Sequence, residues 1–365
     1  MQQDRYRLWP PGPRLVGGVL AAAGVAGVLT VGLAFAGGFL SPGRLTQARL
    51  IDTFESLNGV HPGFRRNHAK GVCIAGAFEA NGAGTRLSSA SVFRSGTTPV
   101  TGRFAVAVGR PFVPDSETEV RSLALAFHLP GGEEWRTGMN DIPVFPVRTP
   151  AGFEEQLLAS RPDPATGKPD PAALKAFFGA HPEAAEAVQR IKARPFSDGF
   201  ANASYNSLDA FRFVNAAGTS TPVRWSMVAK DPFVPAAPRA APTGDDRNYL
   251  FDALAARIAK GPVRWHLMVT VGQPGDPTGD ATQPWPDDRE HVDVGTLVID
   301  HIEAEGPGNC RDVNFDPLVL PSGIAPSDDP LLSARSAAYS TSFTRRAGEA
   351  KTPSEVQFPD HRSGT

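Results

Sequence analysis

One histidine of the sequence lies among residues that could support acid–base chemistry. His68 stands in the stretch Arg65-Arg66-Asn67-His68-Ala69-Lys70-Gly71, where three basic residues flank it, and the apolar run from Val72 to Phe78 follows. Such a histidine could lie at the mouth of a pocket with a positively charged lining, which suits an acidic ligand. A histidine in a surface loop has the same pattern and is the commoner case. These residues alone leave both interpretations open.

Tyr339, one of only four tyrosines, follows Arg335 by four residues in the stretch Arg335-Ser336-Ala337-Ala338-Tyr339. On a helix, residues four apart share a face, so the guanidinium would lie beside the phenol oxygen and favour the phenolate. A phenolate is a competent iron ligand. The alternative is a tyrosine that lies at the helix surface next to an arginine of the same face.

Other chemistries find little support in the sequence. None of the eight histidines forms H-E-x-x-H, and no glycine-rich phosphate-binding motif occurs. The two cysteines, Cys73 and Cys310, form neither C-x-x-C nor C-x-x-C-H, which argues against a zinc ribbon, a dithiol redox motif and covalently attached haem. The sequence does not decide whether they form a disulfide, and we interpret Cys73 as a small core residue. A net charge of -2 gives no reason to expect nucleic acid as a partner.

The amino-terminal segment suggests a membrane anchor. Residues 15–40 carry no charge, and about 20 apolar residues suffice to span a bilayer. Arg5, Arg7 and Arg14 precede this segment, so residues 1–14 would stay in the cytoplasm. We expect a single-pass protein of a bacterial inner membrane, with a transmembrane helix or uncleaved signal anchor at 15–40 and the catalytic domain in the periplasm. A signal peptide cleaved after Ala34-Phe35-Ala36, which would leave a soluble periplasmic protein, and a buried core helix are the alternatives.

The rest of the chain contains the patterns of an α+β protein with an antiparallel sheet or barrel. Apolar and alternating runs predict strands, and N-cap acids followed by proline predict helices. The expected strands are 103–108, 122–129, 211–215, 223–229, 263–272 and 294–302. Two helices are expected from 171 to about 194, separated by a break at 181–182. Two more are expected at 246–261 and 330–346.

Several short sequence motifs occur one after another along the chain. Ala77-Phe78-Glu79 comes after the His68 stretch, and Ser204-Tyr205-Asn206-Ser207 and Trp285-Pro286 come later. Phe315-Asp316-Pro317 and the run P-S-G-I-A-P-S-D-D from Pro321 precede Arg335 and Tyr339. Together these blocks resemble the catalase superfamily, in particular the small catalase-related haem peroxidases. The family's motifs R-x-x-H-A-[KR]-G and R-x-x-x-Y are both matched, and the resemblance covers about residues 45–348.

The resemblance implies a fold and a cofactor. We expect a catalase-like antiparallel β-barrel of about eight strands with surrounding helices over residues 45–348, and a flexible tail over 349–365. The cofactor would be haem b, with Tyr339 as the proximal iron ligand and Arg335 as its charge partner. His68 would be the distal acid/base.

The resemblance also implies roles in the site for two further arginines and for one amide side chain. Arg65 and Arg103 match family positions that contact the haem propionates. The family's G-N-N-T-P motif is matched loosely here, so either Asn140 or Asp141 takes the place of the distal amide. Pro146 stands where the family has a distal phenylalanine.

One departure concerns the support of the distal histidine. Arg103-Phe104 matches the family's R-F-S, but Ala105 replaces the serine. In catalases that serine supports the distal histidine, so we expect altered surroundings for His68.

These features favour a haem-dependent peroxidase that reduces hydrogen peroxide or organic peroxides with a small electron donor. A true catalase is the first alternative. A membrane-tethered barrel that binds haem or another apolar ligand without catalysis is the second. The long amino-terminal arm of catalases is missing, so we expect a monomer or dimer rather than a catalase-type tetramer, and nothing suggests a bound nicotinamide cofactor.

Overall fold

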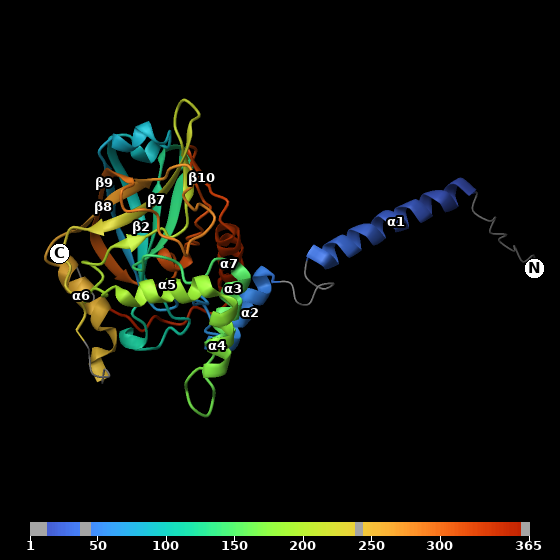
Figure 1. The fold of residues 1–365 in the computed structure, drawn as a ribbon, viewed down its shortest axis with the longest axis horizontal. Helices are drawn as coiled ribbons and strands as arrows, with labels where there is room; N and C mark the ends of the chain where they lie inside the picture. Colours follow the sequence, from blue (N-terminus) through green and yellow to red (C-terminus); the bar gives the residue numbers. More distant parts are fainter. Residues whose placement is uncertain (1–12, 37–44, 238–243, 359–365) are drawn as a thin grey trace, which may run out of the picture. The chain divides into compact units, whose positions relative to one another are not determined.

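The computed structural model describes residues 13–36, 45–237 and 244–358, and the chain divides into two units. The first unit, Met1–Thr46, contains helix α1 (Pro13–Ala36) (Figure 1). Among the described residues, no helix combines the length and the apolarity needed to cross a bilayer. The expected transmembrane helix at 15–40 is therefore not supported, and its residues 37–40 lie outside the described part of the chain.

The second unit, Gln47–Thr365, is built around a closed antiparallel barrel (Figure 1). Its strands pair in the order β7-β5-β4-β3-β2-β1-β9-β8, and pairing of β7 with β8 closes the ring. The barrel therefore has eight strands, as the resemblance predicted, while β6 and β10 continue the sheet from β7. The ten strands are β1 Gly71–Ala80, β2 Gly96–Val106, β3 Arg121–His128, β4 Glu134–Asn140, β5 Tyr205–Asn206, β6 Phe211–Val214, β7 Ser220–Ala229, β8 Val263–Val271, β9 Glu290–Ala304 and β10 Ile324–Pro326.

Large aromatic side chains fill the interior of the barrel. They come from alternate positions of the strands, because successive side chains of a strand point to opposite faces. Fully buried examples are Phe78, Phe104, Phe127, Trp135, Trp225 and Trp265. Two indoles find acceptors inside: Trp225 Nε1 donates to Thr137 Oγ1 at 3.1 Å and Trp265 Nε1 donates to the Ala203 carbonyl at 2.9 Å. The interior is thus a packed core, and a ligand site must lie elsewhere.

The outer face of strands β1–β4 carries mostly small residues instead. Two rows run directly across these strands, and each row contains one residue from each strand. The first row is Gly71, Ala105, Ser122 and Asn140, and the second is Cys73, Arg103, Ala124 and Gly138. Small side chains at these positions leave a shallow floor on the outside of the barrel.

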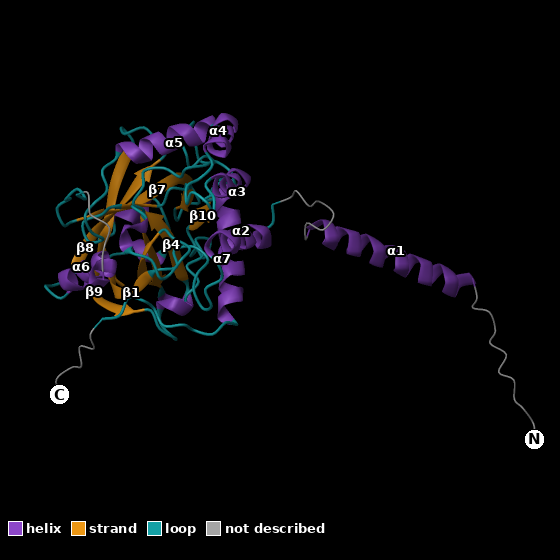
Figure 2. Cartoon of the chain, turned by 90° about the horizontal axis from the view of Figure 1, so that it is seen from below, coloured by secondary structure: helices purple, strands orange, loops and turns teal. Residues whose placement is uncertain are grey.

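Helices cover this floor and the neighbouring faces (Figure 2). α2, α3 and α7 contact one another over the outer face of the barrel. The helices of this unit are α2 Gln47–Asn58, α3 Pro150–Ala159, α4 Pro171–Ala180, α5 Pro182–Ala193, α6 Tyr249–Ile258 and α7 Pro330–Ala347. Short 3₁₀-helices occupy Ala83–Arg86, Ser91–Phe93, Asp115–Glu117, Pro130–Gly132, Gly244–Asn248 and Cys310–Asp312.

The predicted caps and breaks explain where several helices begin. Asp170 and Asp329 accept from the backbone N–H groups of Ala172 and Leu331, and a proline follows each at the first helical position. The expected break at 181–182 separates α4 from α5. The expected helix at 246–261 is shorter, since residues up to Asn248 form a 3₁₀ turn. Helices α2 and α3 and strands β4, β5 and β10 were not predicted, and β1 was anticipated only as the apolar run from Val72 to Phe78.

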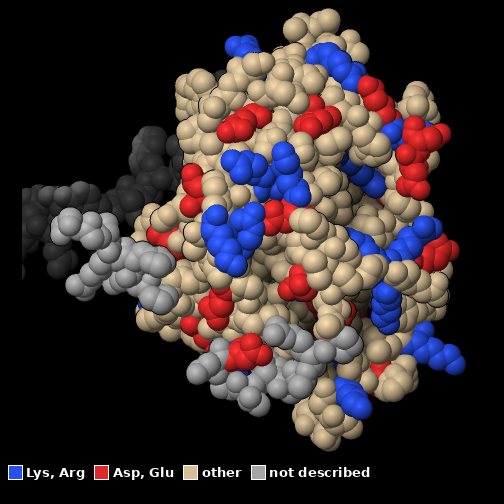
Figure 3. Space-filling view, turned by 90° about the vertical axis from the view of Figure 1, so that its left-hand side faces the viewer, with Lys and Arg blue, Asp and Glu red and all other residues tan. Residues whose placement is uncertain are grey.

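Charges of both signs lie interspersed over the face shown in Figure 3. Surface ion pairs include Arg345 with Asp52 at 2.7 Å and Arg86 with Glu290. Exposed pairs of this kind each contribute at most about 1 kcal/mol, so the stability of the unit depends mainly on its packed core.

The carboxyl-terminal segment corrects the expected flexible tail at 349–365. Val356 is fully buried in the main core, and Ser354 is also buried. Glu349 pairs with Arg66, and Glu355 pairs with Arg247 at 2.8 Å. Residues 349–358 therefore belong to the packed unit, because apolar burial and ion pairs hold them. Residues 359–365 lie outside the described residues.

A disulfide joins Cys73 of β1 to Cys310, which begins the 3₁₀-helix Cys310–Asp312. Both residues are buried, as expected for Cys73, but the pairing was not predictable from sequence. The bond links positions 237 residues apart. It fixes the segment after β9 against the barrel wall.

We predict that replacing both cysteines, as Cys73→Ser with Cys310→Ser, lowers the free energy of unfolding by about 3–5 kcal/mol, because the unfolded chain loses a long closed loop. Urea unfolding followed by circular dichroism measures the change. Dithiothreitol should destabilise the wild type and leave the double variant unaffected; equal sensitivity of the two proteins would contradict a structural disulfide.

Candidate active site

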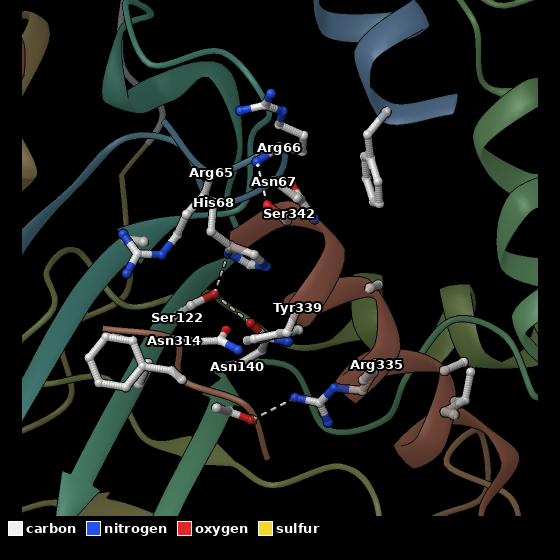
Figure 4. Close-up of a pocket in the computed structure, with 18 of the residues that line it drawn as sticks. Arg65, Arg66, Asn67, His68, Ser122, Asn140, Asn314, Arg335, Tyr339 and Ser342 are labelled. Atoms are coloured by element: carbon white, nitrogen blue, oxygen red, sulfur yellow. Dashed lines mark hydrogen bonds between the residues drawn. The ribbon is translucent and has the colours of Figure 1, made fainter. Parts of the chain in front are cut away.

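A cavity partly open to solvent lies between the barrel floor and the covering helices, and its free space together with the solvent at its mouth amounts to about 1260 Å³. Its polar residues come from the segment before β1, from β2–β4, from the loop after the 3₁₀-helix Cys310–Asp312, and from α7 (Figure 4). All six residues predicted for the site line it: Arg65, His68, Arg103, Asn140, Arg335 and Tyr339. The fold thus brings together residues that lie up to 274 positions apart in the sequence, since Arg65 and Tyr339 share one cavity.

His68 adopts a left-handed backbone conformation, with φ of 53°. Such a conformation is unfavourable for a residue with a side chain and persists where its surroundings fix it. Two buried side chains fix it here. Arg66 pairs with Glu55 at 2.7 Å and with Glu349, and Lys70 pairs with Asp115 at 2.8 Å. The backbone of His68 is therefore held from both sides.

These ion pairs correct one interpretation of the motif. One of the two interpretations of the motif placed His68 at a pocket mouth to which these basic residues gave positive charge. Arg66 and Lys70 are instead buried and neutralised by carboxylates. Arg65 also lines the cavity, and it pairs with Glu305 at 2.9 Å.

The imidazole of His68 is hydrogen-bonded to a residue that was not predicted. His68 Nδ1 lies 2.9 Å from Ser122 Oγ, and Ser122 Oγ donates to Asn140 Oδ1 (Figure 4). Burial, together with the positive charges of Arg103, Arg335 and Arg65, lowers the pKa of His68 to about 3. The ring is consequently neutral at pH 7 and can act as a proton acceptor.

Tyr339 and Arg335 lie on the α7 face that covers the floor. The absence of a side chain at Gly138 allows the phenol to approach β4, because a Cβ there would lie 3.2 Å from the Tyr339 oxygen. Arg335 Nη2 donates to the Gly138 carbonyl at 3.0 Å, and its Nη1 pairs with Asp209. Although burial opposes it, the charges of Asp209 and Tyr339 raise the pKa of Arg335. Arg335 thus stays charged beside the phenol.

A group of buried arginines forms one end of the cavity. Arg103 binds Glu305 through Nε at 2.8 Å and through Nη2 at 3.0 Å. Gly71 makes room for this side chain, since a Cβ on it would meet the Arg103 guanidinium at 2.5 Å. Arg346 also lines the cavity, and burial followed by repulsion from Arg103 lowers its pKa to about 10.

Arg346 was missed, yet the sequence held a signal for it. It follows Tyr339 by seven residues, a spacing that returns to the same helix face. Arg65 and Arg103 both pair with the buried carboxylate of Glu305, and the charge of Arg346 lies near enough to interact with it. A buried excess of positive charge is costly unless an anion compensates it. This end of the cavity therefore suits a negatively charged ligand.

The structure places Asn140 rather than Asp141 in the cavity. Asn140 lines the cavity and accepts from Ser122. Asp141 is buried behind it, where its Oδ1 accepts from the Arg121 backbone N–H at 2.8 Å, and burial raises its pKa to about 6. Alternation along β4 explains the difference, because neighbouring residues of a strand face opposite sides.

Aromatic side chains close the cavity where Pro146 removes the family's phenylalanine. Phe145 and Phe153 both line it, with ring centroids 5.4 Å apart. Phe54 of α2 packs on Phe153 at 6.0 Å. The wall is thus apolar and aromatic despite the substitution.

Comparison with known proteins identifies this combination of barrel and cavity. The sequence profile of the family described as Catalase matches residues 38–362. The chain therefore belongs to the catalase family.

Individual relatives agree with this assignment. A catalase-related peroxidase of Synechococcus elongatus is 38% identical over 323 residues, which are 88% of this chain and 92% of the relative. A catalase-related peroxidase of Mycolicibacterium paratuberculosis is 33% identical over 309 residues, covering 84% of this chain and 96% of the relative. A fungal catalase structure superposes with a TM-score of 0.69 at 22% identity over 84% of this chain. This chain spans 64% of that catalase, whose likeness concerns the fold.

The catalase family is haem-dependent, and the donor set of the cavity fits haem. The floor of small residues and the aromatic wall suit a flat apolar macrocycle. Arg65, Arg103 and Arg346 can compensate its two carboxylates, which the surplus of buried positive charge favours. The Tyr339 oxygen is a suitable iron ligand.

We predict that His68 makes the haem-free protein less stable in acid. Its pKa is about 3 when folded and 6.5 when unfolded, so its contribution is complete above pH 6.5. The contribution is lost as the pH falls towards 3, because only the unfolded chain takes up the proton. The slope is at most about 1.4 kcal/mol per pH unit. His68→Asn, which tolerates positive φ, should flatten this slope in urea unfolding at stepped pH. The control is His301→Gln at an exposed position; equal slopes for both variants would refute the prediction.

Proposed function

We propose that this protein is a haem-dependent peroxidase that reduces hydrogen peroxide or organic peroxides with a small electron donor. Membership of the catalase family makes it an oxidoreductase that acts on peroxide. The observation that carries the finer proposal is the single cavity in which His68, Asn140, Arg335 and Tyr339 converge. The names of the two relatives with 38% and 33% identity favour peroxidase over catalase.

The residues of the cavity have separate tasks in this proposal. Tyr339 and the buried arginines Arg65, Arg103 and Arg346 would hold haem b, with the charged Arg335 guanidinium beside the phenol. Bound haem supplies the redox-active iron at which the peroxide O–O bond breaks. The aromatic wall from Phe145 and Phe153 excludes water from this side of the cavity.

His68 would move the proton that peroxide cleavage requires. Its neutral Nε2 would accept the proton of one peroxide oxygen and return it to the other. The second oxygen would then leave as water or an alcohol. The Asn140 amide donates a hydrogen bond to the peroxide and orients it. Acid–base help of this kind typically contributes 10²–10⁴-fold in rate.

A true catalase remains the second candidate, on one specific observation. The replacement of serine by Ala105 argued for weakened support of His68, yet Ser122 provides a hydroxyl at 2.9 Å. The non-catalytic barrel finds less support, because aromatic side chains fill the barrel interior. Oxygen release from hydrogen peroxide without a donor distinguishes a catalase from a peroxidase.

The deciding measurement is the absorption spectrum of the full chain after haem addition, followed by donor oxidation with hydrogen peroxide. The wild type should give a Soret band and turn over a phenolic donor. His68→Asn should keep the Soret band and lose about 10²–10⁴-fold in peroxidase kcat/KM. Tyr339→Phe should bind haem with an altered spectrum, because the oxygen that would bind the iron is lost.

Two outcomes would contradict the proposal. A wild-type protein that shows no Soret band with haem is not a haem enzyme. Near wild-type turnover in haem-loaded His68→Asn would exclude His68 from proton transfer. Unchanged activity of the exposed variant His301→Gln provides the matched control.

The disulfide supports a location outside the cytoplasm, which we include in the proposal as the periplasm. Disulfides persist in oxidising compartments and are rare in the reducing cytosol. A maleimide–polyethylene glycol reagent applied to denatured, unreduced cell extract should leave Cys73 and Cys310 unlabelled and should label both after reduction. Labelling of both without reduction would contradict this location.

A further inference from the structure

The hydroxyl of Ser122 lies between the two side chains proposed to handle peroxide. It is 2.9 Å from His68 Nδ1, and it donates its proton to Asn140 Oδ1 (Figure 4). Ser122 itself is 9% exposed, so these partners are not replaced by bulk water. One small side chain thus contacts both residues at once.

The number of available protons determines the direction of these hydrogen bonds. A serine hydroxyl has one proton and can otherwise only accept. Because that proton goes to Asn140 Oδ1, Ser122 Oγ must accept from His68, and Nδ1 must carry a proton. A neutral imidazole has one N–H, so Nε2 keeps its lone pair. The Asn140 oxygen is likewise engaged, which leaves its NH₂ group as the donor to a ligand.

The position of Ser122 explains how His68 can be supported although Ala105 stands where the family has a serine. Ala105 on β2 and Ser122 on β3 are direct cross-strand partners. Side chains of such a pair lie on the same face, with Cβ atoms about 4.5–5.5 Å apart. Asn140 is the next partner in the same row. A hydroxyl lost from β2 can therefore be supplied from β3 to the same imidazole.

We infer that Ser122 is a positioning residue that fixes the Nδ1–H tautomer of His68 and turns the Asn140 amide towards the ligand. This role rests on the proposed function, because it specifies how His68 becomes a base at Nε2. It also assigns Ser122, across the strand pair, the support that the motif around Ala105 lacks. Without this hydroxyl, both tautomers become accessible and the imidazole loses its restraint.

Two variants test the inference in the full chain. Ser122→Ala should lower peroxidase kcat/KM about 10- to 100-fold, a part of the 10²–10⁴-fold that a positioned acid–base residue contributes. Adding Ala105→Ser to Ser122→Ala should recover most of this loss, because it returns a hydroxyl to the same face. Ser88→Ala is the matched control, since Ser88 is also buried and donates to the Gly323 carbonyl at 2.8 Å.

The ring nitrogen of His68 that carries the proton is a second readout. A merely structural role of Ser122 would not change it. Proton–nitrogen correlation spectra of the full chain without haem, labelled with ¹⁵N at histidine, show which ring nitrogen is protonated. His68→Asn identifies the resonance. We expect Nδ1–H in the wild type, its loss or mixture with Nε2–H in Ser122→Ala, and its return in the double variant.

Three results would overturn the inference. These are Nε2–H in the wild type, an unchanged tautomer and kcat/KM in Ser122→Ala, and failure of the double variant to recover either readout. If Ser122→Ala does not fold, the tautomer in the double variant decides. A wild type without haem binding or peroxidase turnover would contradict the proposed function instead, and the tautomer measurement would still be valid.

Discussion

Two buried cations on either side of His68, held by three ion pairs, are the constraint on which the cavity depends. Arg66 and Lys70 are each two residues away, and each is neutralised by carboxylates from distant segments. Buried ion pairs add little net stability, because desolvation offsets their attraction, but breaking one is costly. They therefore act mainly as geometric restraints. They hold the left-handed backbone of His68 and, through Glu349, tie it to the chain beyond α7.

The filled barrel gives the cavity its location. Because large aromatic residues occupy the inward positions of the strands, any ligand is confined to the outward ones. There the rows across β1–β4 contain glycine, alanine and serine, so a flat group could lie against the wall. The same alternation that packs the core thus supplies the floor, and helix α7 provides Tyr339 and Arg335 from above. The inward face of the strands forms the core, and the outward face of the same strands forms the floor of the site.

The sequence predicted the local features of the fold and failed where long-range register decides. Caps, breaks and the alternation of strands were readable because they depend on neighbours, and motif order located His68 and Tyr339. Ser122 was hidden because only the pairing of β2 with β3 places it opposite Ala105. The choice between Asn140 and Asp141 likewise needed the register of β4. The Cys73–Cys310 bond depends on segments that approach each other only in the folded chain.

The pairing of β1 has a consequence for the order in which the molecule can be completed. β1 forms ladders with both β2, its near neighbour, and β9, which ends at Ala304. The barrel cannot close until nearly the whole chain has been synthesised, and α7 follows later still. Contacts between distant segments form slowly and leave apolar surface exposed in the meantime. A cofactor that bound early would lack the part of the cavity that α7 provides. The cavity is therefore complete only after α7 has packed onto the barrel.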